Sequence, residues 1–161
     1  MILFIYIIYC FTTLWLHQDP LFPENADRNH MIAEVNKIRS KGCYCGRRYM
    51  PPVGEVKWNE TLYKSAFHHA REMEEFQFFN HFSKEGKNIG DRIEMHGYEW
   101  DFVGENLGEG QENFDEVLRD WRRSYTHCIM LMNPKVDEMA VARFGKYWVQ
   151  HFGKQTVRPQ K

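Results

Sequence analysis

The sequence predicts a single α+β domain in which helices come early and an antiparallel hairpin closes the chain. Three observations support this prediction. The chain has 161 residues, enough for one sizeable hydrophobic core but not for two. Apolar residues recur at helical spacing up to Trp121, and two apolar runs flank a Gly145-Lys146 turn near the end. Helices that precede an antiparallel sheet in this way are typical of the α+β class.

Residues 1–18 are predicted to be a secretory signal peptide or an N-terminal anchor. Only Thr12 and Thr13 interrupt an apolar run over Ile2–Leu16, and the first charged residue is Asp19. The run is shorter than the ~20 residues that span a bilayer as a helix, and it matches the apolar core of a signal peptide. No Lys or Arg precedes it and no small-residue cleavage motif follows it, so an uncleaved anchor stays open. Either interpretation predicts a secreted, periplasmic or cell-surface protein.

The first helix of the domain is expected to follow an extended lead-in over residues 19–27, which holds Pro20 and Pro23. Asp27 is the expected N-cap, and the helix should end near Ser40–Gly42. Its apolar face consists of Met31, Ile32, Val35 and Ile38.

Glycine and proline are frequent in residues 42–57, so this segment is expected to be an ordered loop. Asn59 is the next expected N-cap. It begins a strongly amphipathic helix that runs to about Phe76. The apolar face of this helix consists of Leu62, Ala66, Ala70 and Met73.

The second half of the chain is predicted to add a short helix over residues 91–96, a strand over 103–108 and a helix that ends at Trp121. Strands over 139–144 and 147–152 then form the closing hairpin. The polar residues 154–161 are expected to be a flexible tail.

The charge balance excludes one large class of function. The chain has 21 Lys and Arg against 22 Asp and Glu, for a net charge of -1. A protein that binds nucleic acid by neutralising phosphates carries a basic excess, so no nucleic-acid partner is expected. Aromatic residues make up 16% of the chain, enough to line an apolar groove.

Three cysteines fall inside the predicted domain, and Cys10 falls in the leader. Cys43, Cys45 and the His127-Cys128 pair have the residue types of a Cys₃His zinc site. The Cys-x-Cys spacing is shorter than the usual zinc spacing, and an exported chain favours disulfides. We therefore expect Cys128 to pair with Cys45 or Cys43 and to leave one free thiol. The spacing leaves the choice of partner open.

A second group, His68-His69 with Glu72, is similar to a metal motif, because His69 and Glu72 share a helix face. Zincins, however, require His-Glu-x-x-His, and Met73 occupies the closing position here. Since His69 also lies on the apolar stripe of its helix, we predict that it is a structural histidine.

A third group is the candidate site. His81, Glu105 and His127 each lie at the end of an apolar element or within one, far apart in the chain. Two imidazoles and a carboxylate can bind a divalent cation or act as acid and base. They are the candidate catalytic residues and the candidate metal ligands. Three unrelated surface residues are the alternative.

The chain resembles the CAP superfamily of cysteine-rich secretory, antigen 5 and pathogenesis-related proteins, in its bacterial extracellular SCP-domain form. The resemblance covers residues 28–153. The motifs that carry it are Asn36-Lys37-Ile38-Arg39, Gly42-Cys43-Tyr44-Cys45-Gly46, Trp58-Asn59, His69-Ala70-Arg71-Glu72-Met73, Asn80-His81-Phe82-Ser83, Gly104-Glu105-Asn106-Leu107, Trp121-x-x-Ser124, His127-Cys128 and Tyr147-Trp148-Val149-Gln150-His151-Phe152-Gly153.

The resemblance implies a three-layer α-β-α sandwich with a small antiparallel sheet. It also implies a central cleft lined, in many members, by two histidines and two glutamates. His81 and His127 match the two histidines, and Glu105 matches the glutamate of the Gly-Glu-Asn motif. Ser124 stands where many members have the second glutamate, which removes one anionic ligand.

Three functions follow as expectations. The first is a secreted protein whose cleft binds a small or lipidic ligand at His81, Glu105, Ser124 and His127, with Zn²⁺ or another divalent cation and without catalysis. The second is a metal-dependent extracellular hydrolase, similar to a protease. The third is a surface interaction scaffold. We expect a monomer that contacts a membrane only through an uncleaved leader.

Overall fold

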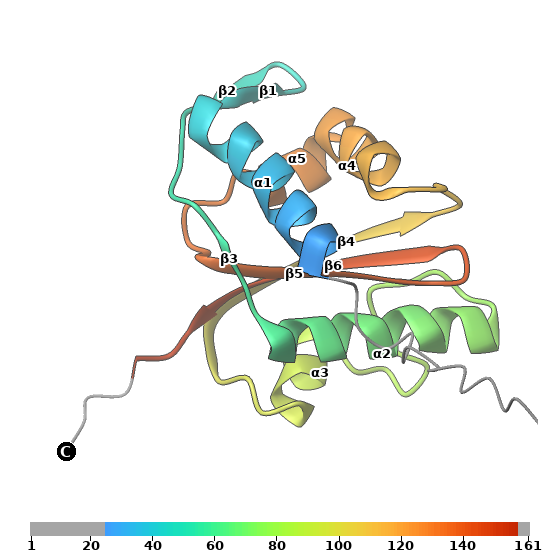
Figure 1. The fold of residues 1–161 in the computed structure, drawn as a ribbon. Coiled ribbons are helices and arrows are strands. Elements are labelled where there is room, and N and C mark those ends of the chain that lie inside the picture. The colour runs from blue at the N-terminus through green and yellow to red at the C-terminus, as the bar shows by residue number, and fades with distance from the viewer. Residues whose placement is uncertain (1–24, 158–161) are drawn as a thin grey trace, which may run out of the picture.

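The computed structural model describes residues 25–157, so the predicted leader lies outside the described residues. The described chain folds into three layers, with a sheet between two layers of helices (Figure 1). This arrangement confirms the predicted α-β-α sandwich. None of the helices within residues 25–157 is both long enough and apolar enough to cross a membrane.

The middle layer is a four-stranded sheet in the order β3-β5-β6-β4. Strands β4 (Trp100–Glu109), β5 (Glu138–Phe144) and β6 (Tyr147–Gln155) pair antiparallel, and the two-residue β3 (Lys57–Trp58) lies parallel to β5. The predicted hairpin is confirmed. Strand β4 is longer than predicted, and β6 includes residues that were expected in the flexible tail, because β4 and β6 pair along almost their whole lengths.

One helical layer contains α1 (Asn25–Lys41), α4 (Phe114–Arg123) and α5 (Tyr125–Leu131). Residues 25–27 are helical rather than extended, which corrects the predicted lead-in. Asp27 therefore lies in the first turn of α1 and not at its N-cap, and a negative charge there interacts favourably with the helix dipole. Helix α5, which has seven residues, was not predicted.

The opposite layer contains α2 (Glu60–Phe76) and α3 (Ile89–Met95). The predicted N-cap of α2 is confirmed: the Asn59 side chain accepts hydrogen bonds from the backbone N–H groups of Thr61 and Leu62. Helix α3 begins two residues before its predicted start, because Asn88 and Asp91 form a capping box.

The segment predicted as a loop over residues 42–57 contains regular structure. Strands β1 (Cys43–Cys45) and β2 (Arg48–Met50) form a small hairpin at the edge of the α1 layer (Figure 1). The turn between them has Gly46 at φ 58°, a conformation that glycine adopts without steric cost. The prediction of a loop was wrong because three-residue strands are too short to show a period.

Two apolar cores lie on the two faces of the sheet. Successive side chains of a strand point to opposite faces. Strand β5 therefore places Met139 and Val141 in one core and Ala140 and Ala142 in the other. The core beneath α1, α4 and α5 also contains Val35, Trp121, Leu131 and Phe152. The core against α2 and α3 also contains Leu62, Met73, Ile93 and Val149.

Candidate functional site

The centre of the candidate site is Glu105 on β4, the outer strand of the sheet. The register of the β4–β6 pair places His151 directly opposite Glu105. His151 Nε2 lies 2.9 Å from Glu105 Oε2, and both side chains are almost completely buried. A buried carboxylate must be compensated by donors, and the neighbouring strand supplies the first of them.

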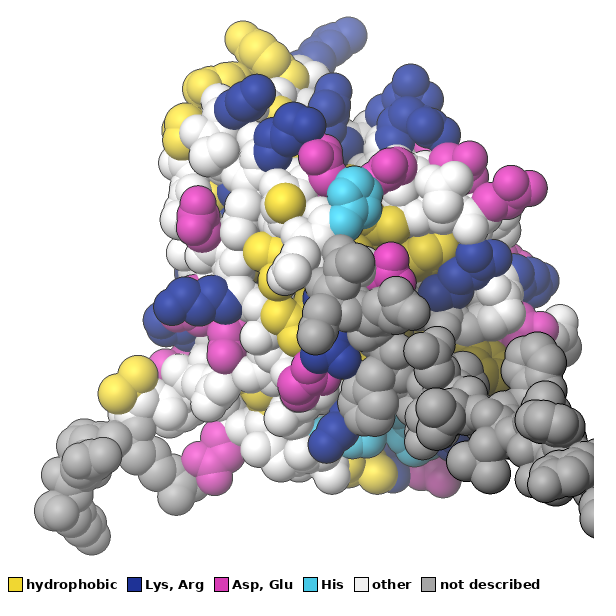
Figure 2. Space-filling model, in the orientation of Figure 1, with side chains coloured by type: hydrophobic (Ala, Val, Ile, Leu, Met, Phe, Trp, Pro, Cys, Tyr) yellow, Lys and Arg dark blue, Asp and Glu magenta, His cyan; other side chains and the backbone are white. Residues whose placement is uncertain are grey.

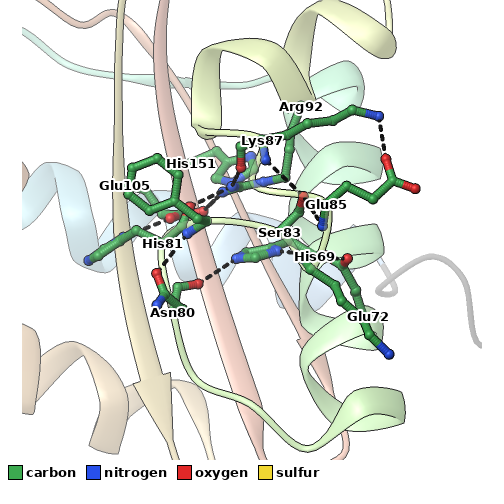
Figure 3. A network of polar contacts seen from close by, with 12 residues as sticks. His69, Glu72, Asn80, His81, Ser83, Glu85, Lys87, Arg92, Glu105 and His151 are labelled. Atoms are coloured by element: carbon green, nitrogen blue, oxygen red, sulfur yellow. Dashed lines mark hydrogen bonds and ion pairs between the residues drawn. The ribbon is translucent and has the colours of Figure 1, made fainter.

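Arg92 on α3 supplies the second donor. Its guanidinium is buried, forms an ion pair with Glu105 Oε2, and donates hydrogen bonds to the backbone carbonyls of His81 (2.6 Å) and Lys87 (3.1 Å). Arg92 therefore neutralises Glu105 and also holds the loop that carries His81. Figure 3 shows the side chains of Arg92, His151 and His81 converging on Glu105.

His81 is the third donor, with Nδ1 2.7 Å from Glu105 Oε1. Its side chain is 57% exposed, whereas that of Glu105 is 2% exposed. The buried carboxylate therefore holds one edge of an imidazole whose other edge faces solvent.

The pKa of Glu105 indicates its charge state and assigns the protons of this network. Burial alone raises the pKa of a carboxyl group. Hydrogen bonds from His151 and His81, and the charges of His151 and Arg92, outweigh burial and lower the pKa of Glu105 below its ordinary value. An ionised carboxylate only accepts hydrogen bonds. His81 Nδ1 and His151 Nε2 therefore carry the hydrogens, and in the neutral tautomer His81 Nε2 keeps a lone pair.

His127 reaches the same edge of the sheet from α5, in the opposite helical layer. Burial lowers its pKa, and the charge of His81 lowers it further, so the neutral imidazole is favoured at pH 7. The Asn106 side chain links α5 to β4 by donating to the backbone carbonyl of His127 at 3.3 Å. Gly104 permits this approach, since a Cβ at that position would lie 2.1 Å from Met130 Sδ.

Ser124 lies at the junction of α4 and α5, where its backbone N–H donates to the carbonyl of Asp120 and its carbonyl accepts from the N–H of Cys128. Its hydroxyl is 3.5 Å from that of Thr126. These contacts are structural, and the ligand-binding role of Ser124 stays a prediction.

The prediction that His81, Glu105 and His127 bind a cation together also stays a prediction, but the contacts revise the role of Glu105. Both of its oxygens already accept hydrogen bonds from buried or oriented donors. Within residues 25–157, the group of three potential ligand atoms that lie within 4.8 Å of one another is Cys43, Cys45 and Cys128. His81, Glu105 and His127 do not form such a group. The residue types therefore fit a cation that is bound by His81 and His127. Glu105 would not bind the cation itself, and would orient the His81 ring through the hydrogen bond to Nδ1.

A pocket of about 280 Å³ lies beside this network, between α2 and α3. Ser65, Arg92 and Met95 are among its lining residues. Ser65 Oγ and Arg92 Nε are buried without a hydrogen-bond partner, and neither atom is exposed to the pocket space.

His69 is a structural histidine, as predicted. Its side chain is buried, with Nε2 2.9 Å from the Asn80 carbonyl and Nδ1 3.3 Å from Glu72 Oε2. The other carboxylate oxygen of Glu72 accepts from the backbone N–H of Lys84. His69 and Glu72 therefore connect α2 to the loop that carries His81.

The cysteine prediction is resolved in favour of Cys45, which forms a disulfide with Cys128, while Cys43 is free. The alternative partner, Cys43, has its sulfur only 3.7 Å from that of Cys128.

Arg92 and His151 were missed as members of the site. Each had a sequence signal: Arg92 lies beside Ile93 in the short helix predicted over residues 91–96, and His151 interrupts the apolar run of the last strand. A charged or polar residue at a position expected to be buried indicates a buried partner. Which partner that is depends on the pairing of β4 with β6.

Comparisons with known proteins agree with this architecture. The model of the cysteine-rich secretory protein family, CAP, matches residues 32–152. Two proteins of Bacillus subtilis are similar to the chain: the uncharacterized protein YkwD is 30% identical over 96 residues, and the uncharacterized membrane protein YlbC is 26% identical over 103 residues. These alignments cover 58% and 64% of this chain but only 37% and 30% of the relatives, so the chain spans about a third of their length.

Two solved structures are similar in fold. An extracellular protein of Bacillus anthracis that contains an SCP domain aligns with a TM-score of 0.71 and 21% identity, over 81% of this chain and 41% of that chain. An outer surface protein of Borrelia burgdorferi aligns with a TM-score of 0.70 and 21% identity, over 84% of this chain and 97% of that chain. At this level of identity, the likeness shows the fold alone.

Proposed function

The chain belongs to the cysteine-rich secretory protein (CAP) family, and from this premise we propose that it is an extracellular binding protein. A divalent cation binds at His81 and His127, beside β4, and a small or lipidic ligand binds in the neighbouring pocket between α2 and α3, without catalysis. The residues predicted to bind the ligand, which are His81, Glu105, Ser124 and His127, are not among those that line this pocket. The extracellular part of the proposal is supported by the two structural neighbours, one an extracellular protein and the other an outer surface protein.

The observation that carries the proposal is the state of Glu105. This carboxylate is buried, ionised and hydrogen-bonded to Arg92, His151 and His81. A general base must be free to take a proton and works best with a pKa near the pH of the reaction. The pKa of Glu105 lies well below that range, so this carboxylate is suited to orient His81 and not to activate water.

The cation is assigned to His81 and His127. Carboxylate–histidine–metal arrangements, in which the carboxylate accepts from one ring nitrogen and the metal binds the other, are common in zinc proteins. Here Glu105 is the carboxylate that accepts a hydrogen bond from His81 Nδ1, and the exposed edge of the same ring is left for the metal. A bound cation would supply a positive charge to an oxygen of the ligand. Because only two side chains would bind the cation, and neither is a carboxylate, we expect the cation to bind weakly and to exchange readily.

The pocket between α2 and α3 is the place for the ligand. Its lining includes the polar side chains of Ser83 and Lys87 and the exposed apolar side chains of Phe76 and Met95. Phe82, next to His81, is exposed as well. Polar donors beside exposed apolar side chains suit a ligand with an acceptor group and an apolar body.

Titration calorimetry with ZnCl₂ tests the cation. We expect heat of binding for the wild type, loss of it in His81→Ala and His127→Ala, and a weakening of about 10- to 100-fold in Glu105→Gln. His30→Ala is the matched control, because His30 is an exposed histidine on α1. The same heat in the double variant His81→Ala/His127→Ala would show that the cleft does not hold the cation.

Titration with a long-chain fatty acid, with and without Zn²⁺, tests the ligand. Met95→Glu places a charge on the exposed rim of the pocket and should abolish this binding while leaving the fold intact. Turnover of a peptide library by the zinc-loaded wild type would contradict binding without catalysis. A lowered melting temperature in His81→Ala, without any change in binding, would favour the scaffold.

A further inference from the structure

Three cysteine sulfur atoms lie together between the β1–β2 hairpin and α5. Cys43 and Cys45 occupy alternate positions of β1, so their side chains lie on the same face of the strand. Cys128 of α5 lies against that face and is bonded to Cys45. The free Cys43 sulfur is 3.7 Å from Cys128 Sγ, and all three sulfurs lie within 4.8 Å of one another.

We propose that Cys43, Cys45 and Cys128 form a thiol–disulfide exchange site, in which Cys128 pairs with either partner and the thiol on Cys43 reacts with small anionic disulfides. The site shares α5 with the histidine site, because His127 precedes Cys128 in that helix. It lies in the helical layer opposite α2, α3 and the loop that carries His81.

The internal step is balanced without an added oxidant or reductant. Cys43 loses its proton to solvent and the thiolate attacks Cys128 Sγ, forming a Cys43–Cys128 bond as the Cys45–Cys128 bond breaks. Cys45 leaves as a thiolate and takes up a proton. One disulfide and one thiol are present before and after the step.

The positions of the sulfurs indicate the movement that exchange requires. A thiolate attacks a disulfide when the three sulfurs lie close to a line. Here all three sulfur–sulfur separations are within 4.8 Å, so the sulfurs form a bent triangle. Cys43 must therefore swing outward around Cys128. Its side chain is half-buried at a pocket of about 590 Å³ between α1 and α4, which leaves space for this rotation.

The same pocket determines which external disulfides reach Cys43. Its lining includes Lys41, Arg119, Arg122 and Arg123, and Figure 2 shows Lys and Arg side chains gathered over this end of the molecule. Burial raises the pKa of the Cys43 thiol, and the charge of Arg122 lowers it. Burial is the larger effect, so the pKa of the Cys43 thiol lies above its ordinary value. Lys and Arg side chains outnumber the two acidic ones of this lining, Glu34 and Asp115, so the pocket attracts disulfides that carry carboxylates.

The two disulfide states differ in what they expose. With Cys45–Cys128 formed, the thiol is on Cys43 and opens to the pocket. With Cys43–Cys128 formed, the thiol is on Cys45, which is fully buried. An incoming disulfide reacts only with the first state: the Cys43 thiolate attacks one of its sulfurs, a mixed disulfide forms, and the other half leaves as a thiolate.

Disulfide mapping of the full chain tests the internal step. The protein is incubated at pH 8, free thiols are alkylated after an acid quench, and pepsin digestion at acid pH prevents further exchange. We expect both Cys45–Cys128 and Cys43–Cys128 peptides. The alkylated residue should be Cys43 in the first and Cys45 in the second. Cys43→Ser, which has no exchanging thiol within the domain, is the control and should give one isomer. A wild type with only Cys45–Cys128 peptides overturns the proposal.

Cys45→Ser gives a second, independent test. We expect it to form the Cys43–Cys128 disulfide under the oxidising conditions that close the wild-type bond, and to leave no reactive thiol in the domain. Two free thiols at Cys43 and Cys128 in this variant would contradict the proposal. Should the variant fail to fold, the wild-type mapping still decides.

The rate of reaction with dithiobis(nitrobenzoate), an anionic disulfide, tests the role of the pocket. We expect Arg122→Gln to slow this reaction about tenfold at low salt, and not to slow the reaction with cationic cystamine. Equal slowing with both reagents would show that Arg122 does not select for charge.

Discussion

A single buried carboxylate determines the character of the candidate site. Glu105 is enclosed by Arg92, His151 and His81, each from a different element of the fold. Separating a buried ion pair by removing one partner leaves an uncompensated charge, which costs far more than removing an exposed pair. The same contacts that make Glu105 unsuited to proton transfer thus make it important for stability.

We predict that Glu105→Gln lowers the free energy of unfolding by about 3–5 kcal/mol, because Arg92 stays buried without its counter-charge. Urea denaturation followed by circular dichroism measures the change. Glu109→Gln on the same strand is the matched control, since Glu109 forms an exposed ion pair with Lys146. A loss no larger than in the control would show that the Arg92–Glu105 pair does not stabilise the fold.

The lowered pKa of Glu105 predicts a dependence of stability on pH. Because the folded state binds this proton less tightly than the unfolded state, the stabilisation is fully present above the ordinary pKa of 4.5 and is lost as the pH falls below it. The difference in unfolding free energy between the wild type and Glu105→Gln should therefore shrink from about pH 6 to about pH 3. Urea titrations at several pH values measure it, and a constant difference would contradict the assignment.

At the scale of the elements, the N-cap of α2 was predicted correctly, whereas the predicted starts of α1 and α3 were displaced by a few residues. Asn59 was identified from sequence as the N-cap of α2, and the structure adds a contact that sequence could not provide: its Nδ2 donates to Glu138 Oε1 at 2.9 Å. The cap therefore also attaches α2 to β5. Helix α5 and the β1–β2 hairpin were missed, while α3, which has the same length as α5, was predicted.

Asn59→Ala should lower the free energy of unfolding by about 1–2 kcal/mol, since it removes two capping bonds and the bond to Glu138. Asn113→Ala at the N-cap of α4 is the comparison, because Asn113 accepts one capping bond, from the N–H of Glu116. Equal losses in the two variants, measured by urea unfolding, would show that the bond to β5 adds nothing.

At the scale of the whole molecule, the sheet is the frame that brings distant residues together. Strand β4 lies at an edge of the sheet, between the two helical layers (Figure 1). His81 is hydrogen-bonded to Glu105 of this strand, and the backbone carbonyl of His127 on α5 accepts from Asn106 of the same strand. The disulfide between Cys45 and Cys128 closes a loop with a sequence separation of 83 residues, which joins the β1–β2 hairpin to α5.

Cys128→Ser removes every disulfide that the three-cysteine cluster can form. By loop-closure entropy it should cost about 4 kcal/mol, seen as a lower urea midpoint than the wild type under non-reducing conditions. Cys45→Ser should lose much less if Cys43 replaces Cys45 as the partner. Equal losses in the two variants would contradict a shared partner, and addition of a reductant should remove the difference between the wild type and Cys128→Ser.

The sequence by itself determined the class of the fold, the main helices, the closing hairpin and the resemblance to the CAP family, because helical and strand periods, caps and turns are encoded locally. It also identified His69 as structural, since its place on an apolar stripe is a local property. The tertiary structure decided which distant groups meet. Arg92 and His151 could be assigned to Glu105 only once the register of β4 and β6 and the position of α3 were known. The choice of Cys45 as the disulfide partner was equally beyond the sequence, because Cys43 and Cys45 share one face of β1 and differ only in how that strand packs against α5.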